Sequence, residues 1–161
     1  MENNFKIRKA TIRDLEDILR LNFELFKKEY REYDKSLNLK WTYGPGGKKF
    51  LRNRIIKKNG FVEVAEKEYK IIGYFCGGIQ ERMFYRKKAK YAEIENMFIE
   101  KKHRRKGLGA ALVKDFIDWC KKNKVDYISV SVSAKNELGL KFYRRAGFKD
   151  YTLTLERKLG K

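Results

Sequence analysis

The sequence predicts an α/β (α+β) fold: a mixed, mostly antiparallel sheet with one parallel strand pair at its centre and helices on both faces. Three stretches of alternating apolar residues, 61–65, 71–79 and 92–99, follow one another without a helical pattern between them, and strands connected in this way pair antiparallel. A helical pattern at 109–121 then separates the third strand from a fourth that contains Ile128, Val130 and Val132. A strand, helix and strand in this order predict a right-handed crossover and a parallel pair.

The rest of the chain supplies elements around this sheet. Residues Thr11 to Asp14 have the pattern of a capping box and predict the start of a helix that continues to about Tyr33. The segment 36–47 contains the only proline and three glycines, which predicts a loop. The other expected elements are a first strand at 5–10, a short helix at 48–58, a helix at 136–146 and a final alternating strand at 151–159.

Length and composition favour one globular domain over residues 1–161. The chain has 42% hydrophobic residues and no apolar run of the roughly 18 residues that a membrane span requires. The N-terminus, Met1 to Asn4, is polar and precedes no apolar segment of a secretory signal. Two cysteines, Cys76 and Cys120, are expected to be reduced core thiols. These features predict a cytoplasmic protein.

The charge is strongly basic: 40 Lys and Arg against 21 Asp and Glu give a net charge of +19. Such an excess favours an anionic partner or ligand. Solubility is the alternative explanation for the charge.

A basic, glycine-containing turn connects the third strand of the sheet to the helix that follows it. It reads Arg104-Arg105-Lys106-Gly107-Leu108-Gly109-Ala110. Glycines allow consecutive backbone N–H groups to point at one anion at a helix N-terminus, so the turn predicts a phosphate-binding site. Leu112 stands where a dinucleotide fingerprint requires a third glycine, and the nucleotide-hydrolase pattern is also absent.

Two motifs give a family resemblance. Arg104-x-x-Gly107-x-Gly109 resembles the [QR]-x-x-G-x-[GA] signature of the GNAT superfamily of acetyl-CoA-dependent N-acetyltransferases. The segment from Asn136 to Phe148 resembles its N-x-x-A-x-x-[FL]-Y-x-x-x-G-F segment, with Gly139 in place of the usual alanine. The opening strand and first helix are similar as well, so the resemblance covers essentially the whole chain and is most specific over 93–148.

The resemblance implies that the parallel strands splay apart and that acetyl-CoA, as co-substrate and without a metal, lies in the opening. Backbone groups of Met97 and Ile99 would hold the pantetheine, and amides from Arg105 through Ala110 the pyrophosphate. Asn136 matches a position that touches the pantetheine arm and is also a good helix N-cap. The full set of implied cofactor-binding residues is Met97, Phe98, Ile99, Arg104, Arg105, Lys106, Gly107, Leu108, Gly109, Ala110, Asn136 and Tyr143.

The resemblance also implies a reaction, in which an amine attacks the acetyl group directly in a ternary complex. The Met97 N–H is the expected donor to the acetyl carbonyl, and Tyr143 matches the family's general acid. Glu93 and Glu95 are the candidate general bases, because a period of two places them on one face of the strand, the same face as Met97. Pairing with lysines, or proton loss to solvent, are the alternatives, and Ser131 occupies a position where some family members have a base.

The sequence leaves the acceptor open between a small amine, an antibiotic-like amine, a protein N-terminus and a lysine side chain. The segment that usually borders the acceptor site holds an aromatic and acidic cluster: Glu29, Tyr30, Glu32, Tyr33, Asp34, Trp41 and Tyr43. Aromatic rings and carboxylates suit a cationic amine.

Two other functions are alternatives to the enzyme. A basic nucleic-acid-binding module would show steep salt dependence and no affinity for acetyl-CoA, but the run 101–106 lacks interleaved aromatic residues for base stacking. The second alternative is a CoA-binding regulator without catalytic activity. The presence of Tyr143 and of two glutamates on the strand argues against it. No membrane association is expected, and either a monomer or a homodimer is compatible with the sequence.

Overall fold

The structure, a computed structural model, describes residues 5–81 and 85–160. Within them the strands are β1 (Lys6–Lys9), β2 (Gly60–Lys67), β3 (Lys70–Ile79), β4 (Tyr91–Ile99) and β5 (Tyr127–Val130). The helices are α1 (Leu15–Glu32), α2 (Pro45–Ile56), α3 (Leu108–Lys122) and α4 (Glu137–Arg145), with short 3₁₀ turns at Ile12–Asp14 and Lys101–His103. Residues Met1 to Asn4, on which the expectation of no secretory signal depends, lie outside the described part.

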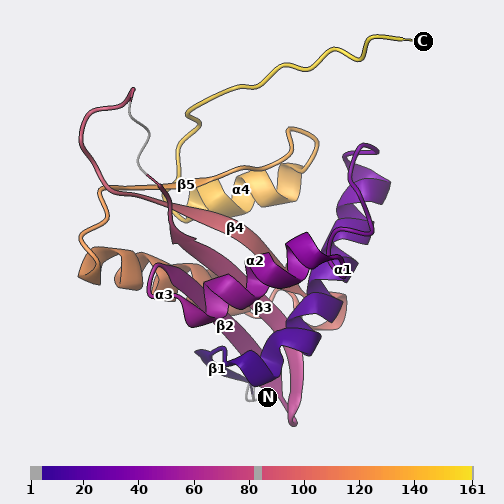
Figure 1. Cartoon of the computed structure of the whole chain (residues 1–161), viewed down its shortest axis with the longest axis vertical. Helices are drawn as coiled ribbons and strands as arrows, with labels where there is room; N and C mark the ends of the chain where they lie inside the picture. Colours follow the sequence, from indigo (N-terminus) through magenta and orange to yellow (C-terminus); the bar gives the residue numbers. More distant parts are fainter. Residues whose placement is uncertain (1–4, 82–84, 161) are drawn as a thin grey trace.

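The five strands form one sheet in the order β1-β2-β3-β4-β5 (Figure 1). The first three neighbouring pairs are antiparallel, and β4 pairs with β5 in parallel. The turn between β2 and β3 contains Glu68 and Tyr69, both with positive φ. The antiparallel meander and the parallel crossover that the sequence predicts are therefore confirmed.

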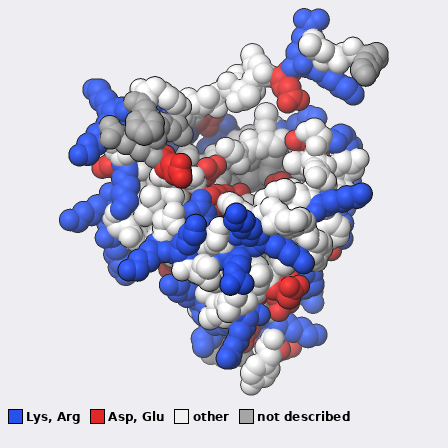
Figure 2. All heavy atoms as spheres, in the orientation of Figure 1, with Lys and Arg blue, Asp and Glu red and all other residues white. Residues whose placement is uncertain are grey.

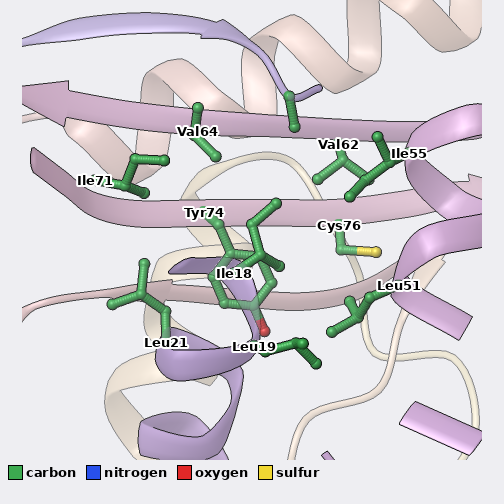
Figure 3. Close-up of a cluster of buried hydrophobic side chains, with 11 residues drawn as sticks. Ile18, Leu19, Leu21, Leu51, Ile55, Val62, Val64, Ile71, Tyr74 and Cys76 are labelled. Atoms are coloured by element: carbon green, nitrogen blue, oxygen red, sulfur yellow. The ribbon is translucent and has the colours of Figure 1, made fainter. Parts of the chain in front are cut away.

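One face of the sheet is covered by α1 and α2 (Figure 1). Figure 3 shows how their apolar side chains meet those of β2 and β3, with Tyr74 of β3 beneath Ile18 of α1. Tyr74 is fully buried in this cluster, and so are Leu21 of α1 and Leu51 of α2. Because β2 and β3 alternate, Val62 and Val64 enter this core while Phe61 and Ala65 point to the opposite face.

The opposite face is covered by α3 and α4. Leu112 and Phe116 of α3 are fully buried there, and Phe116 packs against Phe61 and Phe75 with ring centroids 5.3 and 5.0 Å apart. Phe142 and Tyr143 of α4 are partly buried against the same cluster. Helices on both faces are thus confirmed, and the two cysteines are free and buried, one in each core.

Two boundaries differ from those predicted. Helix α2 begins at Pro45, three residues before the predicted start. Proline is favoured in the first turn of a helix because N–H groups there have no hydrogen-bond partner within the helix, so the absence of an N–H costs nothing. The predicted final strand 151–159 does not form: these residues have no strand pairing, are exposed, and extend away from the body of the molecule (Figure 1). As a result β5 is at the edge of the sheet and the parallel pair is not central.

None of the helices in the described residues is long and apolar enough to cross a membrane.

Candidate functional site

The parallel strand pair opens soon after it begins. The last paired residues are Ile94 of β4 and Val130 of β5, where β5 ends. Beyond Ile94, the only β-ladder that the described residues form with β4 is the one with β3. The side of β4 that faces away from β3 is therefore an open strand edge over Met97, Phe98 and Ile99.

Backbone directions along this edge follow from one hydrogen bond. The N–H of Glu100 donates to the carbonyl of Ile72 at 2.9 Å, so Glu100 faces β3. In an antiparallel pair the residues that exchange such bonds alternate with residues that do not. The backbone groups of Ile99 and Met97 consequently face the open side.

The glycine turn lies directly beyond this edge. The Nε of Arg104 donates to the carbonyl of Ile99 at 2.6 Å and fixes the turn to the end of β4. Arg105 and Gly107 have φ values of 63° and 80°, so two left-handed residues turn the chain sharply before α3 begins at Leu108. The first N–H groups of α3 have no intrahelical partner, so the turn presents both these donors and the positive end of the helix dipole.

Gly109 lies where β4, α3 and α4 meet. A Cβ at this position would be in ordinary contact, 3.5 Å from the Phe142 ring and 3.6 Å from Cδ1 of Ile99. Helix α4 starts with Asn136 as its N-cap, whose Oδ1 accepts from the Gly139 N–H at 2.9 Å. A Cβ at Gly139 would come within 2.6 Å of Nδ2 of the Asn136 side chain, so an alanine here would require that side chain to shift.

Tyr143 is on α4, with its ring perpendicular to those of Phe142 and Phe148. Burial, with a smaller effect from the charge of Glu29, raises the pKa of the Tyr143 phenol to about 12. The hydroxyl is therefore protonated at any physiological pH, and it is a hydrogen-bond donor.

A β-bulge in β4 changes the predicted orientation of the strand residues. Asn96 pairs with Cys76 and Ile94 with Gly77, so Glu95 is an extra residue opposite β3. The prediction that Glu93 and Glu95 share a face with Met97 is wrong. The bulge shifts the alternation by one residue, and Met97 packs in the core under α3, whereas Glu95 contacts Arg54 of α2 on the other side of the sheet.

The Glu95 carboxylate is fully engaged. The Arg54 guanidinium binds both of its oxygens, with Nε at 3.1 and 2.9 Å and Nη2 closer still. The Gln80 amide donates to it at 3.0 Å, and the thiol of Cys76 lies 3.7 Å away. Both ionic side chains are about nine-tenths buried, at 14% and 11% exposed. Sequence reasoning missed Arg54 and Gln80, since no motif connects residues so far apart in the chain.

Glu93 has a different environment. It lines a hollow of about 390 Å³ together with Arg54, Asn59, Ile79, Gln80 and Glu81. Burial, reinforced by the charge of Glu95, raises the pKa of its carboxyl group. In the view of Figure 2, atoms of acidic residues surround the hollow at the centre of the molecule, and Lys and Arg dominate the surface below it.

The residues of the aromatic and acidic cluster predicted to border the acceptor make several separate local contacts. Trp41 stacks on Phe26 with ring centroids 5.2 Å apart. Glu32 pairs with Lys28 and Arg31, both at 2.8 Å, and Asp34 accepts from the backbone and hydroxyl of Ser36. Tyr33 contacts the same Lys28 as Glu32, since the Lys28 ammonium donates to the Tyr33 hydroxyl at 3.0 Å and lies over its ring. Tyr30 has Lys35 over its ring, and Tyr43 is 44% exposed. Glu29 is the member of this cluster whose charge contributes to the raised pKa of Tyr143.

A buried polar chain connects this segment to the bulge. The hydroxyl of Thr42 donates to Asn22 at 2.7 Å, Asn22 donates to the Tyr74 hydroxyl at 2.9 Å, and that hydroxyl donates to Asn96 at 3.3 Å. Asn22 and Thr42 are fully buried, so each link satisfies a group that would otherwise be costly to bury. The chain fixes Asn96, the residue before Met97.

Comparison with known proteins agrees with this geometry. The acetyltransferase (GNAT) family model matches residues 14–148. The chain is 31% identical over 149 residues to the uncharacterized N-acetyltransferase MJ1207 of Methanocaldococcus jannaschii, and covers 91% of its own length but 61% of that relative.

Solved structures share the fold. A predicted acetyltransferase from Clostridium acetobutylicum, solved with acetyl-CoA, has a TM-score of 0.78 at 19% identity, with 96% of each chain covered. An aminoglycoside acetyltransferase from an uncultured soil metagenomic sample, in complex with sisomicin, has a TM-score of 0.69 at 19% identity, with 99% of each chain covered. The family match spans most of the chain, including the open β4 edge, the glycine turn and α4. The protein belongs to the acetyltransferase (GNAT) family.

Proposed function

We propose that the protein is an N-acetyltransferase that moves the acetyl group of acetyl-CoA to a primary amine by direct attack in a ternary complex. The observation that carries this proposal is the open edge of β4 beyond Ile94, continuous with a left-handed glycine turn at the start of α3. A strand edge with unpaired backbone groups suits an amide-containing arm, and a helix N-terminus suits a pyrophosphate.

The residues present fit acetyl-CoA, which would supply the activated acetyl group. Met97 and Ile99 face the open side and would bind the pantetheine amides through their backbone. The amides from Arg105 to Ala110 would hold the pyrophosphate. The Met97 N–H would donate to the acetyl carbonyl oxygen, where a preset donor is worth roughly 3 kcal/mol.

An aliphatic amine has a pKa of about 10.4, so it must lose a proton before it attacks. Of the two β4 carboxylates, Glu93 suits the base role better. Its raised pKa brings it nearer to neutral pH, which favours proton transfer to it. Glu95 would be a positioning residue and not the base, because its carboxylate is already bound by Arg54 and Gln80.

Tyr143 would donate a hydrogen bond to the departing sulfur. Complete proton transfer from a phenol with a pKa of about 12 to a thiolate near 8.5 is uphill by about 3.5 units, roughly 5 kcal/mol. Hydrogen bonding requires no such transfer, so Tyr143 would stabilise negative charge without losing its proton.

Binding of acetyl-CoA is the first test. A ligand that binds only the native state should raise the melting temperature, by an amount that corresponds to about 2.7 kcal/mol at a hundredfold excess over Kd. Differential scanning fluorimetry with acetyl-CoA, NAD and ATP measures this, and we expect a much larger shift with acetyl-CoA. Equal shifts would show only a general anion site, and binding of RNA in place of acetyl-CoA would favour the nucleic-acid alternative.

Tyr143→Phe should lower kcat about 10- to 100-fold and leave the Kd for acetyl-CoA unchanged. The ring still packs against Phe142 and Phe148, and only the hydroxyl is lost, so the effect should fall on the transition state. Steady-state kinetics by CoA release and calorimetry measure the two quantities. Tyr127→Phe is the matched control, because Tyr127 is 60% exposed at the sheet edge. A kcat equal to that of the control would reduce Tyr143 to a packing residue.

A further inference from the structure

β5 is an open edge of the sheet, because its side away from β4 pairs with no strand of the described residues. The other edge strand, β1, is equally short and reads Lys-Ile-Arg-Lys. Charged side chains of this kind protect an edge against pairing with another chain. β5 reads Tyr-Ile-Ser-Val and has neither a charged residue nor a proline. Of the two edges, β5 is therefore the one that can accept a further strand.

The segment 151–159 has the side-chain pattern of a strand. Apolar residues Tyr151, Leu153 and Leu155 alternate with Thr or Glu at positions 152, 154 and 156. Such alternation gives a strand one apolar face, which is stable when another element covers it. Leu153 and Leu155 are instead 75% and 85% exposed, and Figure 1 shows the segment extending away from the body of the molecule. Within the described part of the chain, the segment has neither a strand partner nor a cover for these leucines.

The beginning of this segment is fixed next to the beginning of β5. The guanidinium of Arg86 lies 5.3 Å from the ring centroid of Tyr151 and 5.8 Å from that of Tyr91, and it donates to the Tyr151 hydroxyl. The Tyr91 ring stacks on that of Tyr127, the first residue of β5, with centroids 5.3 Å apart. The residues after Tyr151 leave this anchor and extend outwards, so they do not return to the edge of their own β5.

A second copy of the chain has the same open edge and the same extended segment. We propose that residues 152–159 of one molecule add as a strand to β5 of a second copy, which returns the same contact, so that the protein is a two-fold symmetric dimer formed by strand exchange. Reciprocal exchange of an identical element is a low-cost route to a closed dimer.

Both parts of the segment have a role in this contact. The backbone hydrogen bonds of an added strand supply affinity, and its alternate side chains supply specificity. Leu153 and Leu155 would extend the apolar face that Ile128 and Val130 of β5 present to the core under α3 and α4. Tyr151 would stay at Arg86 of its own molecule and hold the segment in position to cross to the other copy.

Sedimentation equilibrium tests the assembly. The wild type should have twice the chain mass of 19.3 kDa. Leu153→Lys with Leu155→Lys should raise the dimer dissociation constant by at least about 100-fold, because the burial of two leucines is lost in each copy. A wild type that stays monomeric would overturn the proposal.

Thr152→Lys with Thr154→Lys is the matched control. It adds the same charges to the opposite face of the same segment and should remain a dimer. Both double variants should keep the dispersed ¹H–¹⁵N spectrum of the folded chain, since the replaced side chains are exposed in the single molecule. Equal dissociation constants for the two variants would contradict a contact through the leucine face.

Isotope-filtered NOE spectroscopy identifies which β5 the segment contacts. In dimers assembled from ¹³C-labelled and unlabelled chains, the methyl groups of Leu153 and Leu155 should show intermolecular NOEs to Ile128 and Val130. NOEs only within one chain, or a dimer without these NOEs, would overturn strand exchange. None of these measurements requires acetyl-CoA, so their outcome is independent of the proposed acetyltransferase function.

Discussion

Gly109→Asp is expected to lower the affinity for acetyl-CoA by at least about 100-fold, ~2.7 kcal/mol, in a chain that still folds. Gly109 is the second residue of α3, where a carboxylate would accept the N–H groups needed for pyrophosphate and would repel its charge. The fold should persist because the added Cβ makes only ordinary contacts with Phe142 and Ile99. Acidic residues are also favourable in the first turn of a helix.

Isothermal titration calorimetry measures the affinity, and circular dichroism confirms the fold. Gly109→Ala separates charge from volume, since it adds the same Cβ without the carboxylate, and it should bind acetyl-CoA within a few-fold of the wild type. Unchanged affinity in a folded Gly109→Asp variant would mean that the glycine turn is not the pyrophosphate site.

Arg54→Met should have the largest effect on stability. It removes the guanidinium that binds both oxygens of the buried Glu95 carboxylate, leaving Gln80 as its strongest partner. Removing one partner of a buried ion pair typically costs about 3–5 kcal/mol, because the remaining charge stays desolvated. The free energy of unfolding from urea denaturation should fall by about this amount at neutral pH.

Two further variants test the cause. Arg52→Met removes an exposed arginine of the same helix and should change the free energy of unfolding by no more than about 0.5 kcal/mol. In the double variant Arg54→Met with Glu95→Gln the buried charge is gone, so part of the lost stability should return. No recovery would show that Arg54 acts through its packing on Phe50 and not through Glu95.

The sequence predicted the elements that depend on local chemistry. Alternation and helical spacing identified the four sheet strands from β1 to β4, the crossover to β5 and the long helices. Gly107 could be assigned to a sharp turn because only glycine adopts a positive φ freely. Asn136 was recognised as a helix cap because its short polar side chain reaches the N–H of a residue three positions on. Each of these depends on residues a few positions apart, which the sequence displays directly.

The final strand marks the limit of such patterns. Residues 151–159 alternate as a strand should, but alternation describes only the side-chain faces. A strand also requires a partner edge, and the structure does not bring this segment to one. Periodicity alone therefore predicted a strand that does not form, because this segment has no strand to pair with in the structure.

Only the tertiary structure determined which face the strand carboxylates occupy and which side chains they contact. A single extra residue at Glu95 put Met97 on the opposite face from both strand glutamates, and bulges have no reliable signature in one sequence. Arg54 reaches Glu95 from 41 residues away, and the pKa of Tyr143 on α4 is raised mainly by burial and also by the charge of Glu29 on α1. Local sterics and spacing determined which elements form. Which side chains meet was determined by how those elements pack, because contacts between distant residues exist only in the folded chain.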